Sequence, residues 1–169
     1  MITIRREEPE DQTSVRHVNE RAFGREDEAN LVDALRAGNK ALLSLVATRN
    51  DRVIGHILFS AVTIEPGKEN FRAAGLAPMA VLPEFQRQGV GSLLIKIGLD
   101  ECKRAGIEGL VVLGHPNYYP RFGFIPASRY GIKCEFNVAD EAFMAMELRE
   151  GAFQNRQGTA KYQPEFDQF

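Results

Sequence analysis

The spacing of hydrophobic and polar residues changes several times along the chain, and each spacing predicts a different element. Apolar residues recur every three or four positions from about residue 10 to Phe23, which predicts a helix that Gly24 ends. The same period returns between Ala29 and Leu35 and predicts a second helix that ends near Gly38. Ahead of both helices, residues 2–5 have the composition of a short strand.

Segments typical of strands come next. Residues 41–49 and 53–64 are rich in aliphatic and β-branched side chains, and Asn50-Asp51 between them predicts a hairpin. Pro66-Gly67-Lys68 predicts a further turn. Residues 73–82 then form the third strand of this set.

The second half of the chain begins with its clearest helical pattern, over residues 89–105. Residues 109–113 are continuously apolar, as in the buried middle of a sheet. A short helix over 117–122 and strands at 124–125 and 143–148 complete the pattern. This mixed order predicts an α/β (α+β) domain with a partly antiparallel sheet flanked by helices.

Composition mainly excludes certain classes of protein and certain kinds of site. The chain has 169 residues, of which 44% are hydrophobic and 26% charged, as expected for one globular domain. A formal net charge of −2 does not favour nucleic-acid binding. Cys102 and Cys134 are too few for a Cys₄ metal site, so we expect two reduced thiols and no metal. The chain shows neither a signal peptide nor the ~20 apolar residues that span a bilayer, so we expect a cytoplasmic protein without a membrane partner.

Residues 86–91, QRQGVG, connect a predicted strand to the helix over 89–105. A strand that turns through glycines into a helix leaves backbone N–H groups without intrahelical partners, and the helix dipole adds positive partial charge there. Both effects favour a bound phosphate or pyrophosphate. The segment is neither a P-loop nor a dinucleotide fingerprint, because it reads Q-x-x-G-x-G. A purely structural turn is the alternative.

Pro78 lies inside the third predicted strand of the set, although proline cannot donate a hydrogen bond to a sheet. We therefore predict a bulge at Ala77-Pro78-Met79. Such a bulge leaves main-chain groups of Met79 and Val81 free to pair with a ligand that carries amides, such as pantetheine. The alternative is that Pro78 marks an edge strand.

Two longer segments resemble the GNAT superfamily of N-acetyltransferases. Residues 76–91 (LAPMAVLPEFQRQGVG) resemble its fourth strand and acyl-CoA loop, and residues 114–124 (GHPNYYPRFGF) resemble its later Y-x-x-x-G-F signature. The two motifs stand in the expected order. The resemblance implies a GNAT-like domain over residues 1–150 and acetyl-CoA as the acyl donor. We expect the tail, residues 151–169, to pack loosely on the same domain.

The resemblance also implies where the cofactor lies, namely in a V-shaped opening between the strand near Met79 and the strand that ends at Leu113. Main-chain groups of Met79, Ala80 and Val81 would hold the pantetheine. The residues that would surround the pyrophosphate are Arg87, Gln88, Gly89, Val90, Gly91 and Ser92.

The implied reaction is direct attack of a primary amine on the thioester. The oxyanion needs a hydrogen-bond donor, and the Met79 N–H has that position in the family. The leaving thiolate needs a proton, and Tyr119 stands at the family's tyrosine position, four residues before Gly123. Tyr118 is the adjacent alternative for this role, and a packing role is open for both tyrosines.

The general base is not readable from the sequence. Some members of the family place a carboxylate on the fourth strand, but residues 73–82 contain no Asp or Glu. His115, an acidic residue among 26–28, and water remain open as proton acceptors. The missing carboxylate also motivates an alternative function, a non-catalytic acyl-CoA binding or sensing module on the same fold.

The acceptor is not readable either. We expect a small-molecule or peptide amine, selected by the loops over residues 23–30 and 65–70 and by the tail after Gly151. None of these segments carries a chemical signature of its own. Oligomeric state and acyl-group preference also leave no signal.

Overall fold

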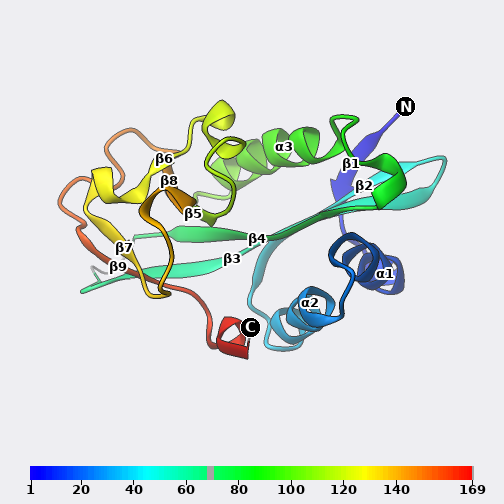
Figure 1. Ribbon diagram of the computed structural model, residues 1–169, viewed down its shortest axis with the longest axis horizontal. Coiled ribbons are helices and arrows are strands. Elements are labelled where there is room, and N and C mark those ends of the chain that lie inside the picture. The colour runs from blue at the N-terminus through cyan, green and yellow to red at the C-terminus, as the bar shows by residue number, and fades with distance from the viewer. Residues whose placement is uncertain (68–70, 169) are drawn as a thin grey trace.

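A mixed sheet forms the centre of the computed structural model, which describes residues 1–67 and 71–168. Its strands follow the order β1-β2-β3-β4-β5-β8-β6 (Figure 1), and all neighbours on this path are antiparallel except β4 and β5, which are parallel. The strands are β1 (Thr3–Arg6), β2 (Ala41–Arg49), β3 (Arg52–Glu65), β4 (Ala73–Val81), β5 (Gly109–Leu113), β6 (Ile125–Pro126), β7 (Ile132–Cys134), β8 (Phe143–Glu147) and β9 (Gly158–Lys161). The predicted hairpin is therefore confirmed, while the end of the expected turn and loop, residues 68–70, lies outside the described residues.

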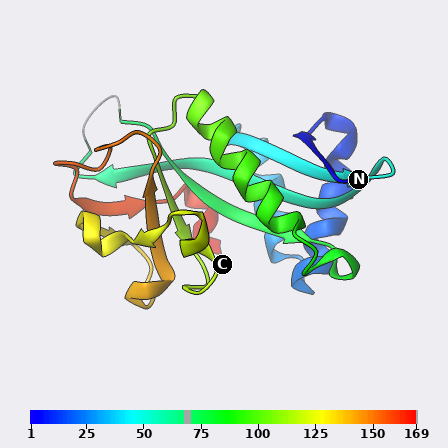
Figure 2. The ribbon, with the colours of Figure 1, turned by 90° about the horizontal axis from the view of Figure 1, so that it is seen from above.

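Helices cover both faces of the sheet. The predicted helices are present as α1 (Gln12–Phe23), α2 (Asp27–Ala37) and α3 (Val90–Arg104). Figures 1 and 2 show α1 and α2 on one face and α3 on the other. Gly24 ends α1 because its φ of 69° is left-handed and its N–H bonds back to a helix carbonyl. Gly98 lets α3 approach the sheet closely, since a Cβ there would stand 2.8 Å from the Phe59 ring.

The predicted bulge in β4 is confirmed. The β3–β4 register shifts beside Leu58, which lies opposite both Ala77 and Pro78. On its other side, β4 pairs with β5 only as far as Leu76. From Ala77 onward β4 is therefore paired along one edge, and the two parallel strands separate.

The C-terminal tail is part of the folded body. Its strand β9 pairs with the end of β3 and with β7, and both pairings were missed by the sequence analysis. Phe153 is 2% exposed and Ala160 is fully buried. The expectation of loose packing is therefore wrong. Ala160 and Tyr162 are buried while Thr159 and Lys161 are only partly buried, which is the period of a short strand that buries one face.

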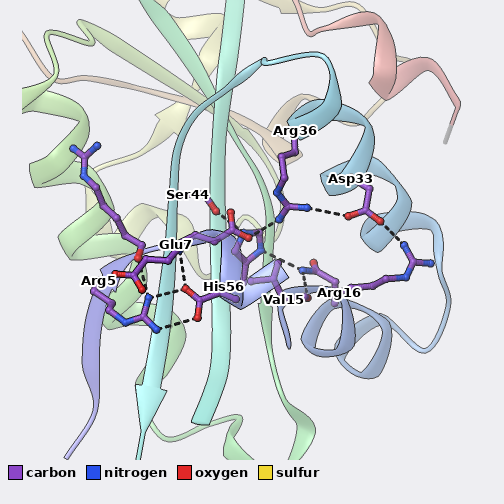
Figure 3. A network of polar contacts seen from close by, with 12 residues as sticks. Arg5, Glu7, Val15, Arg16, Asp33, Arg36, Ser44 and His56 are labelled. Atoms are coloured by element: carbon purple, nitrogen blue, oxygen red, sulfur yellow. Dashed lines mark hydrogen bonds and ion pairs between the residues drawn. The ribbon is translucent and has the colours of Figure 1, made fainter. Parts of the chain in front are cut away.

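A network of polar side chains attaches α1 and α2 to the sheet (Figure 3). His56 of β3 is fully buried, with Nδ1 3.2 Å from Asn19 Nδ2 and Nε2 2.9 Å from Ser44 Oγ. Burial, with a smaller contribution from the charge of Arg36, lowers the pKa of His56 to about 3. Nearby, the Arg36 side chain of α2 pairs with Glu7 next to β1. α1 and α2 therefore contact the sheet through a buried neutral histidine and through ion pairs at the edge of the sheet.

Candidate active site

The edge of β4 that faces β5 is open over its last residues. Hydrogen bonds alternate along an antiparallel pair, and the Leu82 N–H donates to a β3 carbonyl at 2.9 Å. Counting back from Leu82, Ala80 bonds to β3, whereas the main-chain groups of Met79 and Val81 point away from β3 and into the gap. The Gln86 side chain supports this direction, because its Nε2 donates to the Val81 carbonyl at 2.9 Å.

A groove of about 470 Å³ leads from this gap to the first turn of α3. Arg87 and Gly89 have left-handed φ values of 62° and 84°, and the chain then enters the helix. A Cβ at Gly91 would stand 3.3 Å from the Met79 side chain and 3.4 Å from the Tyr118 hydroxyl. Glycine at this position therefore keeps the groove open beside a helix N-terminus, which suits a phosphate group.

Seven of the nine predicted cofactor residues line this groove, namely Met79, Val81, Arg87, Gly89, Val90, Gly91 and Ser92. The structure does not bring Ala80 or Gln88 into it. The Ala80 side chain is buried, and the Gln88 side chain donates to the Glu84 carbonyl at 3.0 Å.

The groove also contains side chains that the predicted site did not include. Phe85 and Arg121 both line it. The guanidinium of Arg121 lies 4.7 Å above the Tyr118 ring, and its Nε donates to the Tyr118 carbonyl at 3.1 Å. Arg121, which belongs to the second motif (residues 114–124), therefore contributes a positive charge to the groove, and its contacts with Tyr118 fix the position of that charge.

A second cavity, the chamber, has a volume of about 300 Å³ and lies on the face of the sheet that carries α1 and α2. Its side chains come from both helices, β4, β5 and three later segments. They are Phe23, Glu28, Leu31, Leu76, Ala77, Pro78, Met79, Leu113, Tyr119, Phe136, Tyr162 and Phe166. Met79 lines the groove as well, so the two cavities adjoin at the gap between β4 and β5.

The two adjacent tyrosines serve different cavities. Tyr119 lines the chamber, where its ring packs between those of Tyr118 and Phe124, with centroids 5.2 and 5.8 Å away. A Cβ at Gly114 would overlap the Tyr119 ring, so glycine provides the space. Burial raises the pKa of Tyr119 to about 12, and the phenol therefore keeps its proton. Tyr118 lines the groove instead, with its hydroxyl 3.2 Å from Ser92 Oγ.

The candidate bases lie in different surroundings. Glu28 lines the chamber, is 14% exposed, and accepts hydrogen bonds from the Arg25 guanidinium at 2.5 and 3.0 Å. These hydrogen bonds lower the pKa of Glu28. Glu26, Asp27 and His115 are exposed, and none of them lines the chamber or the groove. Of the predicted acidic segment, the structure therefore brings one carboxylate to the site.

Comparison with known proteins decides the family. A family model described as "Acetyltransferase (GNAT) domain" matches residues 3–127, which include both sequence motifs. The chain belongs to the GNAT family. It is an N-acetyltransferase of that family, and the fold expected from the resemblance is confirmed by a TM-score of 0.95 to a GNAT structure.

The similar proteins include one over the full length. "Uncharacterized N-acetyltransferase YhbS" of Escherichia coli K12 is 34% identical over 169 residues, 99% of this chain and 100% of YhbS. The YhbS crystal structure with CoA has the TM-score of 0.95, at 32% identity, and the match covers 99% of this chain and 93% of that one. "Uncharacterized N-acetyltransferase YjhQ" of the same strain is 39% identical over 134 residues, 78% of this chain and 74% of YjhQ.

A further solved relative is a GNAT family acetyltransferase from Brucella melitensis in complex with acetyl-CoA. It is 36% identical to this chain, with a TM-score of 0.82 and 99% of both chains covered.

Sequence reasoning located the groove of this GNAT enzyme but missed much of the chamber. Phe136, Tyr162 and Phe166 lie in segments that carry no motif. Tyr162 follows β9, and Phe166 lies in a 3₁₀ turn near the C-terminus. The aromatic residues of the tail were the available signal, because rings of this size are usually buried against the body.

Two further features of the described residues concern cysteines and metal-ligating side chains. Cys102 and Cys134 are free thiols, and burial raises the pKa of Cys102 to about 12. Within residues 1–67 and 71–168, no three His, Cys, Asp or Glu side chains gather as a metal site would require. In the same ranges, no helix combines the length and the apolar character needed to cross a membrane.

Proposed function

We propose that this GNAT enzyme transfers the acetyl group of acetyl-CoA to a primary amine by direct attack on the thioester. The observation that carries the proposal is the junction at Met79, where a groove suited to a phosphorylated cofactor meets a chamber on the other face of the sheet. The relatives YhbS and the Brucella melitensis protein are solved with CoA and acetyl-CoA. This supports the same cofactor here.

The groove would hold the cofactor in two parts. The pyrophosphate would bind at the first turn of α3, where Gly89 and Gly91 allow close approach and Arg121 adds charge. The amides of pantetheine would pair with the Met79 carbonyl and the Val81 N–H, as an additional strand does. The thioester would then lie at the junction, facing the chamber.

The chemistry follows from what surrounds that junction. A neutral amine attacks the carbonyl carbon, the C–N bond forms, and the Met79 N–H stabilises the oxyanion. The C–S bond then breaks, and the Tyr119 phenol, which is protonated at neutral pH, donates its proton to the thiolate as the negative charge develops. The ammonium proton of the product leaves to water, and the phenolate of Tyr119 is reprotonated from water.

The proton acceptor for the amine is water in this scheme. Glu28 is the carboxylate that lines the chamber, and its pKa is lowered by Arg25, which makes it a weak base. The bound amine would therefore attack only after it has lost its proton to water. This predicts a rate that rises with pH up to the pKa of the acceptor.

Calorimetric titration of acetyl-CoA, followed by an assay of amine-dependent CoA thiol release with mass analysis of the product, tests the function. Binding together with an acetylated amine is the expected result. Binding without release from any amine would favour the acyl-CoA sensing module. No binding at all would overturn the proposal.

A further inference from the structure

The chamber has a lining that differs sharply from that of the groove. Among the described residues that line it, five carry aromatic rings, namely Phe23, Tyr119, Phe136, Tyr162 and Phe166. Most of the others are aliphatic, and Glu28 alone is charged. A lining of rings with a few polar groups binds the apolar body of a ligand and orients it through those polar groups.

Exposed apolar side chains also gather at this cavity. Phe23 is 40% exposed and Leu113 is 41% exposed, although both are large hydrophobic residues. Both line the chamber, one from the end of α1 and one from the end of β5. Apolar surface that stays exposed beside a cavity indicates a ligand-binding site.

Tyr162 contributes its ring to the chamber. Its ring packs 5.8 Å from Phe136 and 5.0 Å from Phe166, between centroids. Its hydroxyl is buried and has no hydrogen-bond partner among the described residues. A molecule bound in the chamber therefore meets the ring of Tyr162 and not its hydroxyl.

The charge of the chamber is negative. Glu28 stays ionised because Arg25 binds it from outside, and Arg25 itself does not line the cavity. The ammonium form of an amine can share this carboxylate with Arg25, and ring faces attract ammonium groups as well. A ligand carboxylate next to the amine would be repelled by Glu28. No lysine or arginine lines the chamber to offset this repulsion.

From this lining we infer that the acceptor is a primary amine on a compact aromatic or apolar body, with no carboxylate beside the amine. The inference rests on the proposed function, because it names the acceptor class of the same site. A chamber of about 300 Å³ is at the small end for ligand sites, so it suits a small molecule or one aromatic side chain. Polyamines fit poorly, since a single carboxylate faces an otherwise apolar wall.

The test measures acceptor binding apart from chemistry, by calorimetry on protein saturated with CoA. The probes are 2-phenylethylamine, phenylalanine, which adds a carboxylate, and putrescine, which lacks the ring. We expect 2-phenylethylamine to bind at least about 10-fold more tightly than either. Phenylalanine amide distinguishes a small-molecule amine from the N-terminus of a peptide. If phenylalanine amide binds more tightly than 2-phenylethylamine, the acceptor is an aromatic residue at a peptide N-terminus.

Two matched pairs of variants locate the site. Leu113→Ala is compared with Leu42→Ala, since both leucines are 41% exposed but Leu42 does not line the chamber. Glu28→Gln is compared with Glu26→Gln, whose side chain is 71% exposed. The two chamber variants should weaken 2-phenylethylamine binding by about 5- to 10-fold, and their partners should not. CoA affinity should stay constant in all four, which confirms folding.

The outcomes separate the acceptor class from the function. Tighter binding of phenylalanine or putrescine, or no binding of 2-phenylethylamine, overturns the acceptor class even if other amines release CoA. Selective binding of 2-phenylethylamine without acetylation of any amine supports the chamber assignment and overturns the proposed transferase reaction. An equal loss of 2-phenylethylamine affinity in Leu113→Ala and Leu42→Ala also overturns the assignment of the chamber as the acceptor site.

Discussion

The groove and the chamber are built in opposite ways. The groove takes most of its lining from one stretch, residues 79–92, and presents the open edge of β4 and a helix N-terminus. The chamber collects side chains from seven separate segments and presents rings and one carboxylate. A site made of main chain should suffer most when a side chain is added. A site made of side chains should suffer most when one is removed.

Gly89→Glu should have the largest effect, because it adds bulk and negative charge to the main-chain site. Nothing lies within 4 Å of a Cβ at Gly89, so the new side chain would point into open space at the groove. We expect acetyl-CoA affinity, measured by calorimetry, to fall by at least about 100-fold. Part of any loss would come from a φ of 84°, which a non-glycine residue rarely adopts.

Gly151→Glu is the control for that strain and charge. Its φ is 78°, and Gly151 does not line the groove. The control should bind acetyl-CoA as wild type does. Equal losses in the two variants would show that the glutamate acts through stability or net charge, and the phosphate site at α3 would be wrong.

Tyr119→Phe should have the next largest effect, because it removes the phenol oxygen from the chamber, the site made of side chains. If the Tyr119 phenol protonates the thiolate, kcat should fall by about 100-fold while acetyl-CoA affinity is unchanged. Tyr118→Phe removes the same atom from the neighbouring residue, whose hydroxyl meets Ser92 in the groove. It should leave kcat within about threefold of wild type. The reverse ranking would give the acid role to Tyr118.

The different construction also explains what could be predicted from the sequence. The groove was predictable because a bulge proline, two glycines and a helix start act through local backbone geometry within 16 residues. The mixed sheet was predictable for the same reason, since hairpin turns and apolar periods are local. Ala80 was included with its neighbours, but the pleat turns its main-chain groups toward β3.

The chamber could not be predicted in the same way. Phe136 and Tyr162 reach it because β7 pairs with β9 and β9 pairs with β3, and strands of three or four residues gain their stability from such pairing. No local pattern records which distant strand a short segment will join. The error about the tail, residues 151–169, has this cause.

The chamber wall should also respond to acid, because α1 and α2 rest on His56. In the folded protein the pKa of His56 is about 3, whereas an unfolded histidine has a pKa of about 6.5. Between these values the unfolded chain binds more protons, so the free energy of unfolding falls as pH falls below 6.5. The loss attributable to His56 should reach about 2 kcal/mol at pH 5 relative to pH 7.

Urea unfolding of wild type and His56→Gln at both pH values isolates this contribution from that of the carboxylates. The variant should be less stable at pH 7 but should lose about 2 kcal/mol less between pH 7 and pH 5. His17→Gln makes the same change at an exposed histidine and is the matched control. Parallel slopes in wild type and His56→Gln would show that His56 accepts a proton in the folded protein.

Met79→Leu should have the smallest effect, although Met79 lies where the two cavities meet. The proposed oxyanion donor is the Met79 N–H, which every residue except proline provides. Leucine has nearly the same volume, and the side chain packs beside Gly91 in either case. We expect kcat and the KM for acetyl-CoA to stay within about threefold of wild type in a CoA-release assay. A tenfold fall in kcat with unchanged acetyl-CoA affinity would mean that the thioether itself positions the thioester. The junction would then belong with the chamber, as a site made of side chains.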